Sequence, residues 1–258
     1  MHQRKYTRLA GAISGAVLAL LMAVPSQAEV TQEFHKTVPL TATGTLSLEN
    51  INGDVEITGW DKNEVQIDAQ KKASDQQKLD DMKINVDASS SSVEIKTEYP
   101  HHMVNNNPGS VHYTLHVPAG ARIDKINLVN GAMTVQKLTG EINANLVNGK
   151  VRASELTGEA DLATVNGSIE ADYAALTNVR EIKLKSVNGS INLTLPQSPN
   201  AQVDASVVNG SISTDFPLTV KGRWVGKSMS GTLGSGGVQI ELNNVNGSIH
   251  LGPGRGSL

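Results

Sequence analysis

The stretch that decides the fold runs from Leu128 to Ala171 and reads LVNGAMTV, LTGEINA, LVNGKVRA, LTGEADL and TVNGSIEA, separated by one or two residues. A similar phrase returns every nine residues, and Asn-Gly alternates with Thr-Gly, so each kind of corner returns every eighteen. Asn-Gly readily supplies the positive φ angles of a tight corner. The apolar residues fall at offsets 0, 4 and 6 of each nonapeptide: Val129, Met133, Val135, Leu138, Ile142, Ala144, Val147, Val151, Ala153, Leu156, Ala160, Leu162, Val165, Ile169 and Ala171. Offsets 4 and 6 alternate as a half-buried strand requires, so each nonapeptide is predicted to hold one strand and one corner.

Two architectures fit this pattern. Asn-Gly between two strands is the strongest short signal for a hairpin, which allows a meander of antiparallel strands. A meander gives no reason for the two kinds of corner to alternate with a period of eighteen residues. In a solenoid, two nonapeptides form one coil, like corners stack on one edge, and like strands pair in parallel between coils. The alternation therefore favours the solenoid.

The predicted fold class is all-β: a parallel β-solenoid with two short strands per coil of about 18 to 21 residues, an N-terminal β-rich capping region and one short helix. The corners expected to stack are Asn52, Gly53, Asn130, Gly131, Asn148, Gly149, Asn166, Gly167, Asn188, Gly189, Asn209, Gly210, Asn246 and Gly247. The interval of 37 residues before Asn246 predicts one more coil, with its corner at Ser230 and Gly231. Insertions are expected at the opposite corners, around residues 176–180 and 195–200.

The chain divides into three predicted segments. Basic residues, an apolar run from Leu9 to Val24 and small residues at a cleavage position indicate a secretory signal peptide rather than a membrane anchor. The segment after it is rich in strand patterns and contains the one plausible helix, capped by Ser74 or Asp75. The segments are 1–28 (signal peptide), 29–127 (β-rich region, with strands at 84–88, 92–98 and 111–117 and the helix near 74–83) and 128–258 (solenoid repeats).

Charge and cysteine content narrow the class of protein. Without the three basic residues of the leader, 19 basic and 25 acidic residues leave a net charge of about −6, which argues against binding nucleic acid or anionic lipid. The chain has no cysteine, which excludes disulfides, a thiol nucleophile and the cysteine-dependent lipid anchor of bacterial export. We therefore expect a protein of the periplasm or cell surface, with no integral membrane segment after cleavage of the leader.

One basic and aromatic cluster departs from the repeat. Lys221, Arg223, Trp224 and Lys227 lie within seven residues of one another in an otherwise acidic protein. They form a candidate ligand site, which would grip an anionic glycan or the carboxylates of a protein partner by cation–π and stacking contacts. The alternative is that Trp224 fills the end of the last coils while the basic residues face water.

A row of carboxylates and four histidines are candidates for catalysis and metal binding, and a solvent-facing role is favoured for both. Glu141, Glu159 and Asp161 recur at corresponding places, and stacked coils would bring carboxylates together as a polysaccharide lyase or glycoside hydrolase requires. Such a row is also typical of a solvated sheet face, and few aromatic residues accompany it. The histidines at 101, 102, 112 and 116 are interpreted as solvated, because 112 and 116 would lie about 13 Å apart on one strand. No cofactor, metal or catalytic residue is predicted.

The early segment NINGDVEITGW, the phrase YTLHVPAG at 113–120, the VNGSI repeats and the glycine-rich stretch 222–237 resemble a bacterial family of exported β-strand-repeat proteins called putative adhesins. The resemblance covers almost the whole mature chain. It implies a parallel β-solenoid in the cell envelope, of unknown function, and brings no catalytic residues. The predicted function is a non-catalytic, adhesin-like interaction or scaffold module whose partner is a protein or glycan of the envelope.

Overall fold

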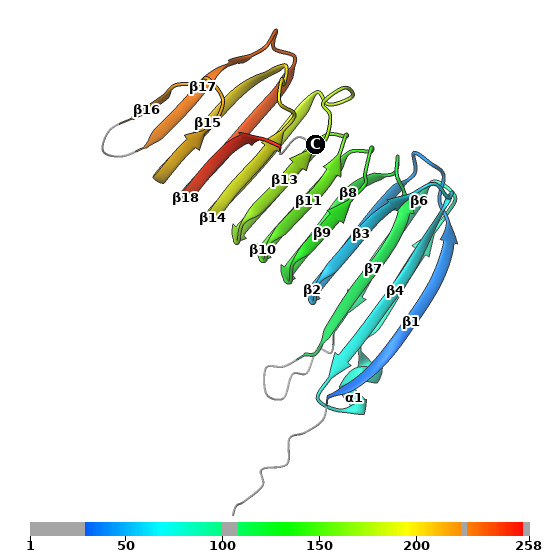
Figure 1. Ribbon diagram of the computed structural model, residues 1–258. Helices are drawn as coiled ribbons and strands as arrows, with labels where there is room; N and C mark the ends of the chain where they lie inside the picture. Colours follow the sequence, from blue (N-terminus) through cyan, green and yellow to red (C-terminus); the bar gives the residue numbers. More distant parts are fainter. Residues whose placement is uncertain (1–28, 100–107, 223–225, 255–258) are drawn as a thin grey trace, which may run out of the picture.

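The protein is described by a computed structural model that covers residues 29–99, 108–222 and 226–254. Strands make up most of these residues, and within them α1 (Gln76–Asp81) is the one helix. Figure 1 shows the strands side by side along the molecule, from β1 and β4 at one end to β16 and β17 at the other. The all-β class with one short helix is therefore confirmed.

The strands pair in two series, which we call ladder A and ladder B. Every pairing within the two lists below is parallel. Ladder A contains, in spatial order, β6 (Ser92–Glu98), β2 (Thr45–Asn52), β8 (Arg122–Asn130), β10 (Ile142–Asn148), β12 (Ala160–Asn166) and the first halves of β14 (Glu181–Leu195), β18 (Val238–Pro253) and β15 (Ala201–Thr214). Ladder B contains β7 (Ser110–Pro118), β3 (Val55–Trp60), β9 (Met133–Gln136), β11 (Val151–Leu156), β13 (Ile169–Tyr173) and the second halves of β14, β18 and β15.

Antiparallel strands cover both ends of ladder A and the N-terminal end of ladder B. At one end, β5 (Lys83–Ala88) pairs with β6, β4 (Glu64–Ala73) with β7, and β1 (Val30–Pro39) with β4. At the other end, β17 (Lys227–Leu233) pairs with β15, and β16 (Val220–Gly222) pairs with β17. An antiparallel strand at the end of a parallel series covers an edge that would otherwise offer unpaired backbone groups.

The chain crosses from ladder A to ladder B at each Asn-Gly corner, and the corners lie in register. Asn130 pairs with Asn148, and Asn148 with Asn166, as the repeat predicts. The order changes at the C-terminal end, where Asn188 pairs with Asn246, and Asn246 with Asn209. The last unit of the chain, β18, therefore lies between β14 and β15 rather than at the end.

The prediction of a further corner at Ser230 and Gly231 is wrong. Both residues lie inside β17, which runs antiparallel to β15. The physical reason is that this part of the 37-residue interval forms the β16–β17 pair at the end of ladder A instead of one more unit. The predicted insertions are confirmed, because residues 174–180 and 196–200 connect strands.

The N-terminal region joins the same sheet as the repeats. The strands predicted at 84–88, 92–98 and 111–117 are confirmed within one residue at each end. The predicted helix is confirmed as α1, whose N-cap Asp75 accepts a hydrogen bond from the backbone nitrogen of Lys78. β2 and β3 pair directly with β8 and β9. The division of the chain after residue 127 stays a prediction.

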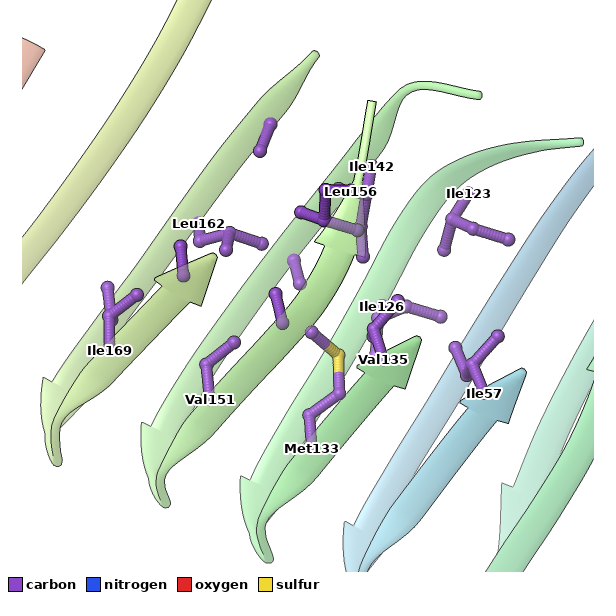
Figure 2. Packing of buried hydrophobic residues seen from close by; sticks show 14 of the residues in the cluster. Ile57, Ile123, Ile126, Met133, Val135, Ile142, Val151, Leu156, Leu162 and Ile169 are labelled. Carbon is purple, nitrogen blue, oxygen red and sulfur yellow. The ribbon is translucent and has the colours of Figure 1, made fainter. Parts of the chain in front are cut away.

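The core lies between ladders A and B. Figure 2 shows Ile142 and Leu162 from ladder A opposite Val151 and Ile169 from ladder B. All four side chains are buried, as are the other inward-facing Val, Ile, Leu, Met and Ala residues of both ladders. Burial of these rows is the main favourable contribution to stability, because each rung removes apolar surface from water on both ladders.

Candidate interaction surfaces

An asparagine column marks the edge where the chain passes from ladder A to ladder B. Each side-chain amide after that of Asn52 donates to the side-chain oxygen of the preceding asparagine in the column, at distances from 2.8 to 3.0 Å. The column contains, in spatial order, Asn52, Asn130, Asn148, Asn166, Asn188, Asn246 and Asn209. Stacked asparagine ladders of this kind stabilise parallel in-register strands.

We expect removal of adjacent members of this column to be non-additive. Asn148 takes part in two column hydrogen bonds, as does Asn166, and one of these bonds is shared. At about 0.5 kcal/mol for each exposed hydrogen bond, Asn148→Ala and Asn166→Ala should each cost about 1 kcal/mol of unfolding free energy. The double variant should cost about 1.5 kcal/mol, because the shared bond is lost only once. Urea unfolding of the four proteins measures the difference, and strict additivity would contradict the hydrogen-bonded column.

The glycine after each asparagine is required by close approach of the backbones. A Cβ built on Gly149 would lie closer than 3.0 Å to the backbone oxygen of Gly131, a separation that real Cβ atoms essentially never show. Gly167 meets the backbone oxygen of Gly149 in the same way. None of these three glycines has a positive φ angle. The prediction that glycine supplies a positive φ does not hold at these three corners, where contact between neighbouring units is the cause, but it is confirmed at Gly53, Gly189, Gly210 and Gly247.

An aliphatic column runs beside the asparagine column on the outer face of ladder A. Its members precede the asparagines in sequence and are 38 to 49% exposed: Ile51, Val129, Val147, Val165, Val187, Val245 and Val208. The residue before each of them points inward, as buried Leu128 and Leu146 show. Seven exposed branched side chains in one row are a surface that a soluble protein usually reserves for contact.

The aliphatic column lines a groove with a volume of about 580 Å³. It extends over six strands of ladder A, from β8 to β15. The other side of the groove is formed by residues two positions before the aliphatic column: Asn127, Asn145, Ala163, Lys185, Asn243 and Ser206. Lys185 is the one charged residue among the described residues that line the groove, and it forms no ion pair within the described part of the chain.

The outer face of ladder B is polar. A shallow hollow of about 400 Å³ is lined there by Thr134, Gln136, Arg152, Ala153, Ser154, Glu170, Ala171, Asp172, Asn192 and Thr194. Glu170 accepts hydrogen bonds from Lys150 and, at 3.2 Å, from Arg152. The hydrogen bond from Lys150 is the largest influence that holds the pKa of the Glu170 carboxyl below its usual value. The hollow therefore presents hydroxyls, amides and a fixed ion-pair network to solvent.

The predicted basic and aromatic cluster is described only in part. Lys221 lies on β16 and Lys227 on β17, and Gly222 pairs with Lys227 in the antiparallel register. Arg223 and Trp224 lie outside the described residues. The ligand site at these four residues stays a prediction.

Of the carboxylates considered for catalysis, Glu141 and Glu159 immediately precede β10 and β12, and Asp161 lies on β12. Glu159 accepts a hydrogen bond of 2.5 Å from Arg180, and Glu141 lies 3.4 Å from the Nε of Arg122. Neither glutamate lines the groove on ladder A or the hollow on ladder B. Both carboxylates are thus held in ion pairs on the outer surface.

Two of the four histidines that were weighed as metal ligands, His112 and His116, contact neighbouring side chains. The Nδ1 of His112 lies 3.7 Å from the carboxylate of Asp54, and the ring of His116 stacks on Trp60 with centroids 5.3 Å apart. His101 and His102 lie outside the described residues. Within the described ranges, no three His, Cys, Asp or Glu side chains come together as metal ligands.

The sequence pattern alone did not separate the aliphatic column from the core. Offset 0 of the nonapeptide holds valine before Asn-Gly and leucine before Thr-Gly, and the two were grouped as one apolar position. Leu138 and Leu156 are buried, whereas Val129 and Val147 are exposed. The leucine immediately before Val129 and before Val147 is the available signal, because adjacent residues of a strand face opposite sides.

No helix within the described part of the chain has the length and apolar character that crossing a membrane requires.

The fold is similar to that of a solved structure. The crystal structure of a putative cell adhesion protein from Clostridium sporogenes has a TM-score of 0.55 and 16% identity, covering 87% of this chain and 100% of that one. At that identity the likeness shows the fold alone. The structure of a putative adhesin from Bacteroides fragilis has a TM-score of 0.41 and 12% identity, covering 89% of this chain and 98% of that one. Comparison with curated proteins gives no match.

A family model described as Toastrack DUF4097 matches residues 26–252, which is most of the sequence. The predicted resemblance to the bacterial putative-adhesin family of unknown function is confirmed by this match. The chain belongs to the Toastrack DUF4097 family.

Proposed function

We propose that this protein is an exported, non-catalytic scaffold of the cell envelope, adhesin-like in its role, whose stacked units form a parallel β-solenoid. The solenoid is supported by the in-register asparagine column and by parallel pairing of successive units in both ladders. A solenoid of stacked units presents long, regular faces suited to contact with a large partner. Export is supported by the leader pattern in residues 1–28, which lie outside the described residues, and by the adhesin names of structural neighbours.

The observation that carries the proposal is the polar outer face of ladder B. Arg152 is well exposed and held by Glu170, and threonine, serine and asparagine side chains surround this pair. Such a face offers many hydrogen-bonding groups in fixed positions, as a glycan or a polar protein surface requires. The partner we propose is accordingly a protein or glycan of the envelope.

The polysaccharide-acting enzyme is the less favoured alternative. A glycoside hydrolase needs one carboxyl that donates a proton and a second that acts as base or nucleophile across the scissile bond. Glu141 and Glu159 are instead ion-paired with Arg122 and Arg180. Each carboxylate is therefore occupied by an arginine, and neither lines the groove on ladder A or the hollow on ladder B where a substrate chain would lie.

Photo-cross-linking in the native envelope tests the proposal. A photoreactive amino acid in place of Thr134 on the outer face of ladder B should give a discrete adduct with an envelope protein or glycan. The same amino acid in place of Asn143, on ladder A, should not. Arg152→Glu should weaken the Thr134 adduct, whereas the matched change Arg122→Glu on ladder A should leave it intact.

Two outcomes would contradict the proposal. One is the absence of any adduct from the ladder B position in cells that contain the folded protein. The other is release of sugar from envelope polysaccharide that is lost in Glu159→Gln, which would favour the enzyme.

A further inference from the structure

The geometry points to a second binding site: we propose that the groove on the outer face of ladder A binds the hydrocarbon chain of a fatty acid of about twelve carbons, with the carboxylate at Lys185. This site is separate from the polar face of ladder B. It goes beyond the scaffold function proposed above and does not depend on it.

The width of the aliphatic column argues against a protein as the occupant. Neighbouring strands are about 4.8 Å apart, so the six strands that line the groove give it a length of about 24 Å. The groove is about one side chain wide, and a stable protein interface buries about 800 Å² on each partner. A strip of roughly 24 Å by 10 Å provides less than half of that area. A second copy of this chain would also place a hollow against a hollow, which leaves space unfilled.

The repeat along the groove argues against an extended peptide. Polar groups on the groove wall, such as Asn127 and Asn145, are spaced by whole strand intervals of about 4.8 Å along the groove, and Ala163 interrupts their row. An extended peptide repeats about every 6.8 Å on each side, so its backbone groups would fall out of step with that wall. Backbone groups left without partners on an apolar floor would be costly. A hydrocarbon chain has no hydrogen-bonding groups, so the spacing of polar groups along the groove wall does not matter for its binding.

Lys185 fixes the chemistry of the head group. It is exposed and free of ion pairs within the described residues, whereas nearby Lys183 is bound to Glu181 at 2.6 Å. In the next strand the residue in register with Lys185 is Ala163, whose small side chain leaves the groove wall open beside the ammonium group. A single unpaired cation at an apolar floor complements one carboxylate locally, whereas the net negative charge of the whole protein disfavours an extended anionic surface such as a membrane of anionic lipids.

The length of the groove suits one acyl chain. From Lys185 on β14 to Val129 on β8 the groove crosses three strand intervals, which is about 14 Å. A lipid chain spans about half of the 30 Å hydrocarbon core of a bilayer, or about 15 Å. The volume of about 580 Å³ is within the usual range of small-molecule sites, about 300 to 1,000 Å³. The tail would therefore lie over Val165, Val147 and Val129.

Titration with free laurate below its micelle concentration tests the site on the full mature chain. Calorimetry should give one site per chain, and amide chemical shifts should change along β8, β10, β12 and β14. Dodecanol should bind more weakly than laurate, and dodecylammonium more weakly still. Lys185→Gln should weaken laurate about threefold to fivefold, the range of an exposed ion pair, and should remove its advantage over dodecanol.

Val165→Asn should weaken both laurate and dodecanol at least tenfold, because it places an amide on the apolar floor. Val165→Thr, which keeps the branched shape, guards against a simple folding defect and should weaken both ligands less than the asparagine variant. The matched controls Val220→Asn, on β16, and Lys83→Gln, on β5, should leave binding unchanged. Circular dichroism of each variant establishes that it is folded.

Three results would overturn the proposal. They are the absence of laurate binding, binding that Val165→Asn and Lys185→Gln leave unchanged, and dimerisation of the free protein that Val165→Asn abolishes. The last would assign the groove to a second copy of the chain. Because purified protein and a free fatty acid are used, these results leave the envelope cross-linking test unaffected.

Discussion

Gly149→Ala should destabilise the protein by more than about 4 kcal/mol, or prevent folding altogether. The added methyl group would have to occupy the position of the Gly131 backbone oxygen on the neighbouring unit. Backbone cannot move aside as a flexible side chain can, so relief requires the two units to separate. Gly149 has no positive φ, so its backbone conformation places no further penalty on alanine. Urea unfolding followed by circular dichroism measures the loss of stability.

Gly254→Ala is the matched control for this substitution. A Cβ at Gly254 would have its nearest neighbour at 3.4 Å, the Cγ2 of Thr194, which is ordinary van der Waals contact. We expect a change within about 0.5 kcal/mol of zero. Equal effects of the two substitutions would contradict the close stacking of the glycine corners.

The second large effect is expected at Leu146, with its neighbour Val147 as comparison. Leu146 is 3% exposed and faces the core, whereas Val147 is 42% exposed and belongs to the aliphatic column. Leu146→Ala should cost about 2 to 4 kcal/mol, since it removes buried methyl groups and leaves a cavity. Val147→Ala should change stability by no more than about 0.5 kcal/mol.

The same unfolding measurement distinguishes these two adjacent positions. If the valine substitution were the more costly of the two, the strand would face the opposite way, and the groove on ladder A would not exist. Leu128 and Val129, one unit away, offer an independent repetition of the comparison.

Much of the architecture could be predicted from the repeat. The eighteen-residue spacing of Asn130, Asn148 and Asn166 fixed which residues lie next to one another, because like corners of successive units can stack only in register. The alternation after each corner likewise identified the inward rows, such as Val151 and Ile169. These features follow from local periodicity, which one sequence records directly.

The order of the last units could not be predicted, because their sequences are degenerate. The pentapeptide VNGSI occurs at 165–169, 187–191, 208–212 and 245–249, so any of these units offers the same corner and the same buried isoleucine to a neighbour. Placement of β18 between β14 and β15 is decided by the segment between β15 and β18, which forms the antiparallel β16–β17 pair. Long-range pairing of this kind leaves no periodic signal.

The candidate surfaces were predicted less well than the fold. The sequence drew attention to Lys221, Arg223, Trp224 and Lys227, because a basic and aromatic cluster is conspicuous in an acidic chain. The groove could not be predicted, because the sequence pattern assigns its valines to the core. Its one charged lining residue, Lys185, has no distinctive sequence context, and only the strand register places it beside Ala163 and the aliphatic column. Surfaces formed by residues from six strands become visible only when the register is known.

The stacking order of the corners is tested most directly by cysteine cross-linking, since the native chain has no cysteine to interfere. Cysteines replacing Asn188 and Asn246 would lie on adjacent strands, about 4.8 Å apart, within the range that a disulfide spans. Cysteines replacing Asn188 and Asn209 would lie two strands apart, at about 10 Å, beyond that range. Under mild oxidation, the first pair should form an intramolecular disulfide in the folded protein and the second should not. A disulfide in the second pair but not in the first would contradict the stacking on which both ladders, the asparagine column and the groove depend.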